Sequence, residues 1–213
     1  MKNLNIAISS YRSAPFGGGQ GIFIYELSKA LQKLGHTVDI ISGPPYPALE
    51  PNINLIKSPG LDLFSTFVFK ERVKIFFNKK NKSLDDLYEF LSVLFGSFPE
   101  MKTFGNRVNK LLKNNSYDII IDNQSISYGM LKIQESIPLI EIIHHPITKD
   151  YQYDILFSKG IIQKLSKWRW FSFLKMQKKV ASNLNVISTP SHNSMGDIEK
   201  DFKVARDKIV VIP

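Results

Sequence analysis

The chain has 213 residues, with 28 Lys plus Arg against 19 Asp plus Glu and a formal net charge of +9. Its length allows one large domain or two small ones, and a content of 43% hydrophobic and 22% charged residues excludes a disordered or fibrous chain. The lack of cysteine excludes disulfide scaffolds, thiolate zinc sites and cysteine nucleophiles. No apolar run approaches the roughly 18 to 20 residues of a membrane-spanning helix, and the N-terminus is typical of a strand, so we expect a cytoplasmic protein.

The positive charge suggests an anionic partner, which is a nucleic acid, a membrane surface or a phosphorylated substrate. Arginine is the residue best suited to forked contacts with phosphates and guanines, and the chain has only Arg12, Arg72, Arg107, Arg169 and Arg206. Nucleic acid is therefore the less favoured partner. A Lys- and Asn-rich composition inherited from an AT-rich genome explains the charge equally well.

Hydrophobic periodicity predicts strands that alternate with helices. Apolar residues alternate from Leu4 to Ile8, a Gly- and Pro-rich loop follows over 9–21, and one helix face runs from Ile24 to Leu34 and ends at Gly35. We expect further strands at 37–42, 54–56, 117–122, 138–143, 184–188 and 208–212, and helices near 100–114, 125–135, 160–182 and 192–203. This order predicts an α/β fold with a doubly wound, mostly parallel sheet flanked by helices, whose binding residues follow the carboxyl ends of strands.

Two stretches depart from this pattern. Residues 61–104 contain ten aromatic residues, and residues 155–196 contain no Asp or Glu. In these stretches aromatic residues stand beside cations, namely Phe76 and Phe77 beside Lys79, Lys80 and Lys82, and Trp168 and Trp170 around Arg169. The pairing predicts peripheral binding to an anionic membrane, with 61–98 as the more mobile contact. The alternative is that the rings belong to the core and the lysines to a solvated face.

The loop before the first helix is rich in glycine, with the sequence Gly17-Gly18-Gly19-Gln20-Gly21. Glycine lets backbone come close to a ligand, and a helix N-terminus offers free N–H groups that suit phosphate. The dinucleotide fingerprint G-x-G-x-x-G fails at Ile22, and the Lys-Ser/Thr pair of a Walker A loop is missing. A turn without a ligand is the alternative interpretation.

His144 and His145 follow the strand expected at 138–143, at the ligand edge of a parallel sheet. Adjacent residues in an extended chain point in opposite directions, so we expect at most one of them to face a given cleft. The other histidines are His36 and His192, and their spacing predicts no metal site. An imidazole at this edge can bind a sugar hydroxyl or phosphate, or move a proton. A histidine that only satisfies backbone groups at a strand end is the alternative.

Taken together, these motifs resemble the N-terminal domain of a family-4 glycosyltransferase with the GT-B fold. The resemblance spans the chain and rests on segments in order: Gly18-Gly19, Leu27 to Leu31, Leu34-Gly35-His36-Thr37-Val38, His144-His145-Pro146-Ile147 with Asp150, 186–191 and 207–213. It implies one acceptor-side α/β domain over 1–213, with 61–104 as a helical aromatic and basic insertion. The family's donor domain is absent from this chain, which stops at Pro213, so we expect a truncated form, a split gene product or a degraded relative that is inactive alone.

The resemblance also implies a reaction and a set of site residues. The reaction is a retaining transfer from a nucleotide-diphosphate sugar to a glycan or lipid-linked acceptor, without a metal or cofactor. His144 is the expected catalytic contact, Gly18 and Gly19 lie near the donor diphosphate, and the remaining expected binding residues are Gln20, His145, Asp150 and Ser191.

Two other functions compete with this interpretation. One is a non-enzymatic module that binds anionic membrane or nucleic acid through its basic, aromatic faces. The other is a different nucleotide-binding α/β protein, which the failed dinucleotide and Walker patterns disfavour. The sequence predicts no particular donor sugar, acceptor or oligomeric state.

Overall fold

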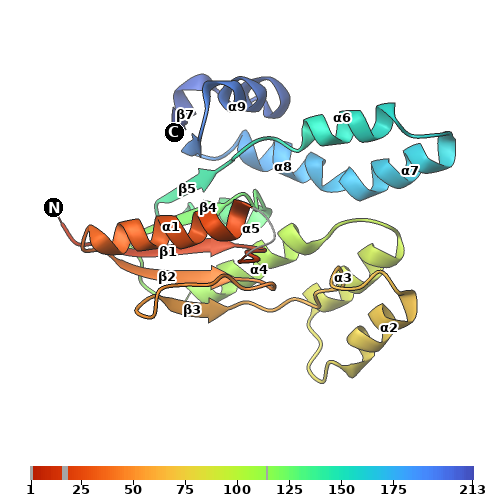
Figure 1. Cartoon of the computed structure of the whole chain (residues 1–213), viewed down its shortest axis with the longest axis horizontal. Helices are drawn as coiled ribbons and strands as arrows, with labels where there is room; N and C mark the ends of the chain where they lie inside the picture. Colours follow the sequence, from red (N-terminus) through yellow and green to blue (C-terminus); the bar gives the residue numbers. More distant parts are fainter. Residues whose placement is uncertain (1, 16–18, 114) are drawn as a thin grey trace.

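The computed structural model describes residues 2–15, 19–113 and 115–213. These residues form a seven-stranded sheet whose strands all run parallel, in the order β3-β2-β1-β4-β5-β6-β7 (Figure 1). The strands are β1 (Asn5–Ser10), β2 (Thr37–Ser42), β3 (Asn54–Lys57), β4 (Ile119–Asn123), β5 (Leu139–Ile142), β6 (Ile187–Thr189) and β7 (Ile209–Val211). The expected α/β fold with a parallel sheet is confirmed.

Helices occupy most of the crossovers between strands. They are α1 (Gly19–Lys33), α2 (Phe69–Asn78), α3 (Leu84–Leu94), α4 (Glu100–Leu112), α5 (Tyr128–Ile133), α6 (Thr148–Leu156), α7 (Ile161–Trp170), α8 (Leu174–Ala181) and α9 (His192–Asp197). The helix expected over 160–182 is interrupted by a 3-10 turn at Phe171–Phe173, where two buried phenylalanines enter the core. None of the helices in the described ranges is both long and apolar enough to cross a bilayer.

The two faces of the sheet carry separate apolar layers because strand side chains alternate. In β1, Ile6 and Ile8 pack with Ile24 of α1 on one face. Ala7, between them, joins the larger cluster that contains residues of α4, α5 and α8 on the other face. Helices therefore cover both faces, as in a doubly wound fold.

Glycines fix two features of this packing. Gly35 has φ +89° and ends α1, as the sequence predicts. Gly105 of α4 and Gly129 of α5 lie against each other, and a Cβ added at Gly129 would be 2.1 Å from the carbonyl oxygen of Gly105. The two helices therefore approach more closely than residues with side chains at these positions would allow.

The strand order reverses between β1 and β4. From β1 the chain proceeds to β2 on one side, whereas β4 pairs with β1 on the other side and is followed outward by β5. Ser10 and Asn123 are register partners at the carboxyl ends of these two strands. Ligands of open α/β sheets bind in the crevice at such a reversal, and a cavity of this protein lies there.

Candidate functional site

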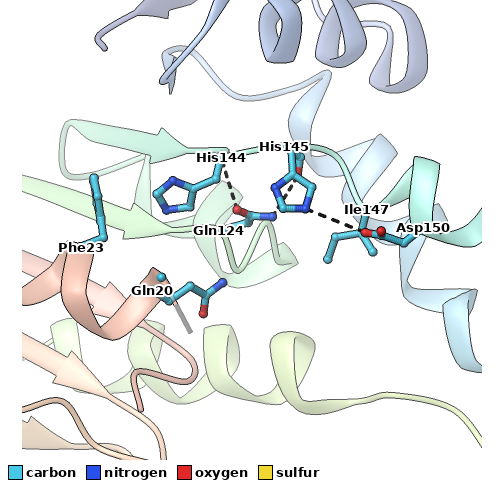
Figure 2. A pocket seen from close by; sticks show the side chains of 8 residues that line it. Gln20, Phe23, Gln124, His144, His145, Ile147 and Asp150 are labelled. Atoms are coloured by element: carbon cyan, nitrogen blue, oxygen red, sulfur yellow. Dashed lines mark hydrogen bonds and ion pairs between the residues drawn. The ribbon is translucent and has the colours of Figure 1, made fainter. Parts of the chain in front are cut away.

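A cavity of about 470 Å³ opens at the carboxyl edge of the sheet (Figure 2). It is bounded by the first turn of α1, the loop after β4, the loop after β5 and the first turn of α6. Its lining residues are Gly19, Gln20, Phe23, Gln124, His144, His145, Ile147 and Asp150. None of these described lining residues is Lys or Arg, and Phe23 and Ile147 add apolar surface to the polar groups.

The structure brings together five of the seven residues that the sequence nominated. Gly19, Gln20, His144, His145 and Asp150 all line the cavity. Gly18 lies outside the described residues.

Ser191 has a different place in the fold. Its Oγ accepts a hydrogen bond from the backbone N–H of Ser194 at 3.1 Å and so caps α9, and it is not among the residues that line the cavity. A role for Ser191 in binding stays a prediction.

The expectation that only one of the two histidines faces the cleft is wrong, because both line it. Strand β5 ends at Ile142, and the chain bends at His144. The alternation of side chains that holds within a strand therefore no longer applies at these residues. The two rings differ in environment: the side chain of His145 is 63% exposed and its Nε2 lies 3.9 Å from Asp150 Oδ2, whereas His144 is half-buried.

His144 is held between two neighbours. Its Nε2 lies 2.8 Å from Asn123 Oδ1, and the ring of Phe23 meets it edge-on at a centroid distance of 4.7 Å. Burial, together with the nearby His145, lowers the pKa of His144 from its ordinary value of 6.5. The ring is therefore neutral at physiological pH.

The amide of Asn123 determines which nitrogen of His144 carries the proton. Its Nδ2 donates to Ser10 Oγ at 3.1 Å, so its Oδ1 is the atom that faces His144 and accepts. The neutral imidazole must then donate from Nε2, which makes Nδ1 the acceptor available to a ligand.

Gln124 holds the backbone of both histidines. Its Oε1 accepts from the N–H of His144 at 3.1 Å, and its Nε2 donates to the carbonyl oxygen of His145 at 2.9 Å (Figure 2). Gln124 itself has φ +60°, and Ile126, two residues later, has φ +44°. Left-handed backbone at a β-branched residue is strained, so the surrounding structure must hold this loop in place.

Two buried acids below the cavity hold the loop. Asp122 accepts from Ser9 Oγ at 2.5 Å and from the N–H and Oγ of Ser125 at 2.8 and 2.7 Å. Glu141, the register partner of Asp122 on β5, is fully buried and accepts from the N–H of Ile126 at 3.2 Å. Burial, and the carboxylate of Asp122 beside it, raise the pKa of Glu141 well above its usual value. This shift favours the protonated, neutral form of Glu141.

The sequence interpretation missed Asn123 and Gln124. A signal was available, because both follow the strand expected at 117–122 directly, at the same edge of the sheet as the histidines. It also missed Phe23 and Ile147, which no polar pattern marks.

The glycines in the first turn of α1 have different roles. A Cβ at Gly19 would meet no heavy atom within 4 Å, so Gly19 leaves open space beside the cavity. A Cβ at Gly21 would lie 2.1 Å from the carbonyl oxygen of Ala14, so this position requires glycine for the fold. Gly19 and Gln20 also line a neighbouring hollow of about 270 Å³ that includes Arg12. The guanidinium of Arg12 is paired with Glu100 at 3.0 Å.

Within the described ranges, no group of three or more His, Asp or Glu side chains is arranged to hold a metal ion. The groups that a ligand would meet in the cavity are the neutral imidazole of His144, the loop held by the amide of Gln124, the exposed pair of His145 and Asp150, and the N-terminus of α1.

Comparison with known proteins identifies relatives of the whole chain. The sequence model of Glycosyltransferase Family 4 matches residues 17–213. The chain is 36% identical over 214 residues to the MMP α-(1→4)-mannosyltransferase of Mycolicibacterium hassiacum. The alignment covers 99% of this chain and 51% of that protein, so the chain spans about half the length of this relative.

Solved structures show the same fold at low sequence identity. A glycosyltransferase from Rickettsia africae aligns with a TM-score of 0.52 at 16% identity, over 99% of this chain and 43% of that one. The catalytic domain of starch synthase IV from Arabidopsis thaliana aligns with a TM-score of 0.53 at 14% identity, over 99% and 51%. With the family match over most of its length, the chain belongs to glycosyltransferase family 4.

Proposed function

We propose that this chain is the acceptor-binding half of a retaining glycosyltransferase. The enzyme moves a sugar from a nucleotide-diphosphate sugar to a glycan or a lipid-linked acceptor. The observation that carries the proposal is the cavity at the reversal of strand order, which gathers five of the nominated residues next to the N-terminus of α1.

The N-terminus of α1 supports placement of the donor diphosphate at that side of the cavity. Helix α1 has 15 residues and no acidic residue in its first turn, and its first two residues, Gly19 and Gln20, line the cavity. Free backbone N–H groups at a helix N-terminus favour the negative charge that grows on the diphosphate as the glycosidic bond breaks. Because no lining Lys or Arg was found among the described residues, the cations that pair with the diphosphate belong to the donor side of the enzyme.

His144 supports a role in orienting the sugar or the acceptor. Its neutral ring donates from Nε2 to Asn123, which leaves Nδ1 to accept a hydrogen bond from a substrate hydroxyl. In the proposed reaction, the bond from C1 to the diphosphate oxygen breaks and the acceptor oxygen bonds to C1 on the same face. The proton of the acceptor hydroxyl leaves with the diphosphate. Imidazole accepts from a different hydroxyl of the sugar or the acceptor, which positions the reacting groups, and it need not change its charge.

The identity to the mannosyltransferase supports an α-linked hexose, with mannose as the first sugar to assay. The proposal keeps the cytoplasmic location expected from the sequence.

The test uses the full-length protein of which these residues form a part. It is incubated with a panel of nucleotide-diphosphate sugars, mannose among them, and with glycan and lipid-linked acceptors. We expect release of nucleoside diphosphate that depends on an acceptor, and an α configuration in the product by NMR. An inverted product would contradict the retaining mechanism. A full panel without transfer would favour the alternative of a non-enzymatic interaction module.

A further inference from the structure

Helices α6 and α7 form an arm, residues 148–170, that extends beyond the carboxyl edge of the sheet (Figure 1). Neither helix contains a buried residue. The arm is attached at its base, where Trp170 packs against Phe64 and Phe98 at centroid distances of 5.2 and 5.3 Å. Helices in proteins derive most of their stability from the packing of an apolar face. In this arm Tyr151 and Trp170 pack against the core near the base while partly exposed, and neither helix buries a residue fully.

The apolar side chains of the arm gather at its tip. Phe157, Ile161 and Ile162 flank the turn at Gly160 and are 76%, 78% and 83% exposed. Further exposed apolar residues continue along the two helices, namely Tyr153, Leu156, Leu165 and Trp168. Such an exposed apolar surface marks an interaction site. Because the most exposed residues stand on a projecting turn, the surface suits a partner into which a tip can insert.

The charge around the tip is positive. Lys159 lies in the turn and Lys164 one turn into α7, and neither forms an ion pair with a described residue. Lys167, in contrast, is paired with Asp154 at 2.7 Å. From 155 to 196 the chain has no acidic residue, so nothing in this segment repels an anionic surface.

A second arm, formed by α2 and α3, lies at the same end of the molecule (Figure 1). It exposes Phe69, Phe77 and Leu84, with Lys70 and Lys80 exposed nearby. Two separate projections with the same combination of apolar and basic side chains fit one broad, anionic plane. A single small protein partner would have to bridge them.

We infer that the α6–α7 arm docks onto an anionic lipid bilayer. Phe157, Ile161 and Ile162 enter the boundary between headgroups and acyl chains, and Lys159 and Lys164 contact the anionic headgroups. Two aromatic residues that the sequence proposed as anchors are excluded: Phe76 is buried and stacks on Phe90 at 4.2 Å, and Trp170 belongs to the base of the arm. This inference does not depend on the proposed transfer, because binding to a bilayer requires no catalysis.

The test is sedimentation of the full-length protein with vesicles of phosphatidylcholine alone or with rising fractions of phosphatidylglycerol. We expect binding only with the anionic lipid, weakened as salt is raised from about 0.1 M to 1 M. Combined replacement Phe157→Ser, Ile161→Ser and Ile162→Ser should lower the partition coefficient at least tenfold. Lys159→Glu and Lys164→Glu should each lower it by about fivefold or more. The matched control is Lys33→Glu with Leu34→Ser, which changes an exposed cation and an exposed apolar residue at the far end of α1.

A second readout does not require these variants to fold. The difference in fluorescence between the full-length protein and its Trp168→Phe variant reports the environment of Trp168. We expect a blue shift on addition of anionic vesicles and none with phosphatidylcholine. Absence of binding to anionic vesicles would overturn the inference, as would equal loss in the control variant. A different result would be that the protein does not bind vesicles but associates with itself, and that the combined replacement at the tip abolishes this association. That result would overturn the inference and assign the surface to a second copy of the chain.

Discussion

The Nε2 atom of His144 lies 2.8 Å from the Oδ1 atom of Asn123, and this contact joins the segment after β5 to the carboxyl end of the adjacent strand β4. Its partner is a neutral amide, so nothing in the contact favours a charged imidazole. Burial and His145 both lower the pKa of His144 below 6.5. The acceptor function of this ring should therefore persist into mildly acidic solution.

This relationship gives a prediction on pH. Below its pKa, His144 is protonated and Nδ1 no longer accepts, so the acid limb of kcat/KM should lie below pH 6.5. Asn123→Asp places a carboxylate beside the ring, which favours the imidazolium and raises its pKa. We expect the acid limb to move upward by about one unit, because an opposite charge at this distance shifts a pKa by about that amount or more. Asn123→Ser, which adds no charge, should leave the limb in place, and superimposable profiles for all three proteins would contradict the assignment.

The two histidines should differ in their contribution to turnover. His144 is half-buried and oriented by Asn123, whereas His145 is largely exposed beside Asp150. We expect His144→Ala to lower kcat by about 100-fold and His145→Ala by less than about tenfold, within the range of a positioned acid–base or hydrogen-bonding group. Steady-state rates of the full-length enzyme check this, with circular dichroism as the folding control. Equal or reversed losses would show that His145 is the residue that meets the substrate.

Substitutions at the two glycines in the first turn of α1 should separate effects on stability from effects on turnover. Gly21→Ala places a Cβ 2.1 Å from a backbone oxygen and should destabilise the fold by about 1–3 kcal/mol in urea unfolding. Gly19→Val meets open space and should leave stability almost unchanged, yet lower turnover strongly because the side chain enters the cavity. Normal turnover in Gly19→Val would remove this residue from the site.

The raised pKa of Glu141 predicts how the free energy of unfolding depends on pH. Its pKa is raised in the folded protein, so the folded state holds the proton more tightly than the unfolded chain does. The stabilisation is fully present below the unfolded pKa of about 4.3, and is lost as pH rises toward the folded pKa. Glu141→Gln keeps a neutral group of the same shape, so its stability should fall less over this range.

Urea unfolding of both proteins between about pH 5 and 8 measures the difference. Burial also raises the pKa of Glu100 to about 7, and this contributes in the same direction in both proteins, so the comparison isolates Glu141. Parallel curves would mean that Glu141 is ionised in the fold.

Residues 1–213 alone should bind nucleotide-diphosphate sugars weakly. The described lining of the cavity contributes a helix N-terminus but no Lys or Arg to pair with the diphosphate. Calorimetry with a panel of such sugars measures the dissociation constants. Values in the low micromolar range would show that this half is itself a donor site.

Much of the fold could be predicted because its signals are local. The sequence predicts β1 from alternating apolar residues, α1 from an apolar helix face that ends at Gly35, and β2 from the apolar run that follows. All three elements are confirmed. Helix α6, which contains Asp150, is not among the elements that the sequence predicts. Since α6 buries no residue, its sequence has no apolar stripe by which periodicity could reveal it.

The candidate site was harder to predict, because its geometry arises where regular structure ends. Strand alternation predicts that at most one of His144 and His145 faces the cleft, whereas both do, since the chain bends after β5. The hydrogen bonds from Gln124 to the backbone of both histidines depend on the left-handed backbone of Gln124, which is uncommon for residues other than glycine. Such a conformation is imposed by the surrounding fold, here by Asp122 and Glu141, and sequence periodicity does not report it.

The adjacency of β1 and β4 also affects how the protein refolds. Ser9 and Asp122, which are hydrogen-bonded at the centre of the sheet, are 113 positions apart in the chain. Helices form in about a microsecond, whereas a pairing between such distant segments must first close a long loop and so comes late. Because the walls of the cavity come from both sides of this pairing, most of the helical content should return before the cavity exists. During synthesis, the cavity likewise cannot assemble until the chain has emerged well past β5.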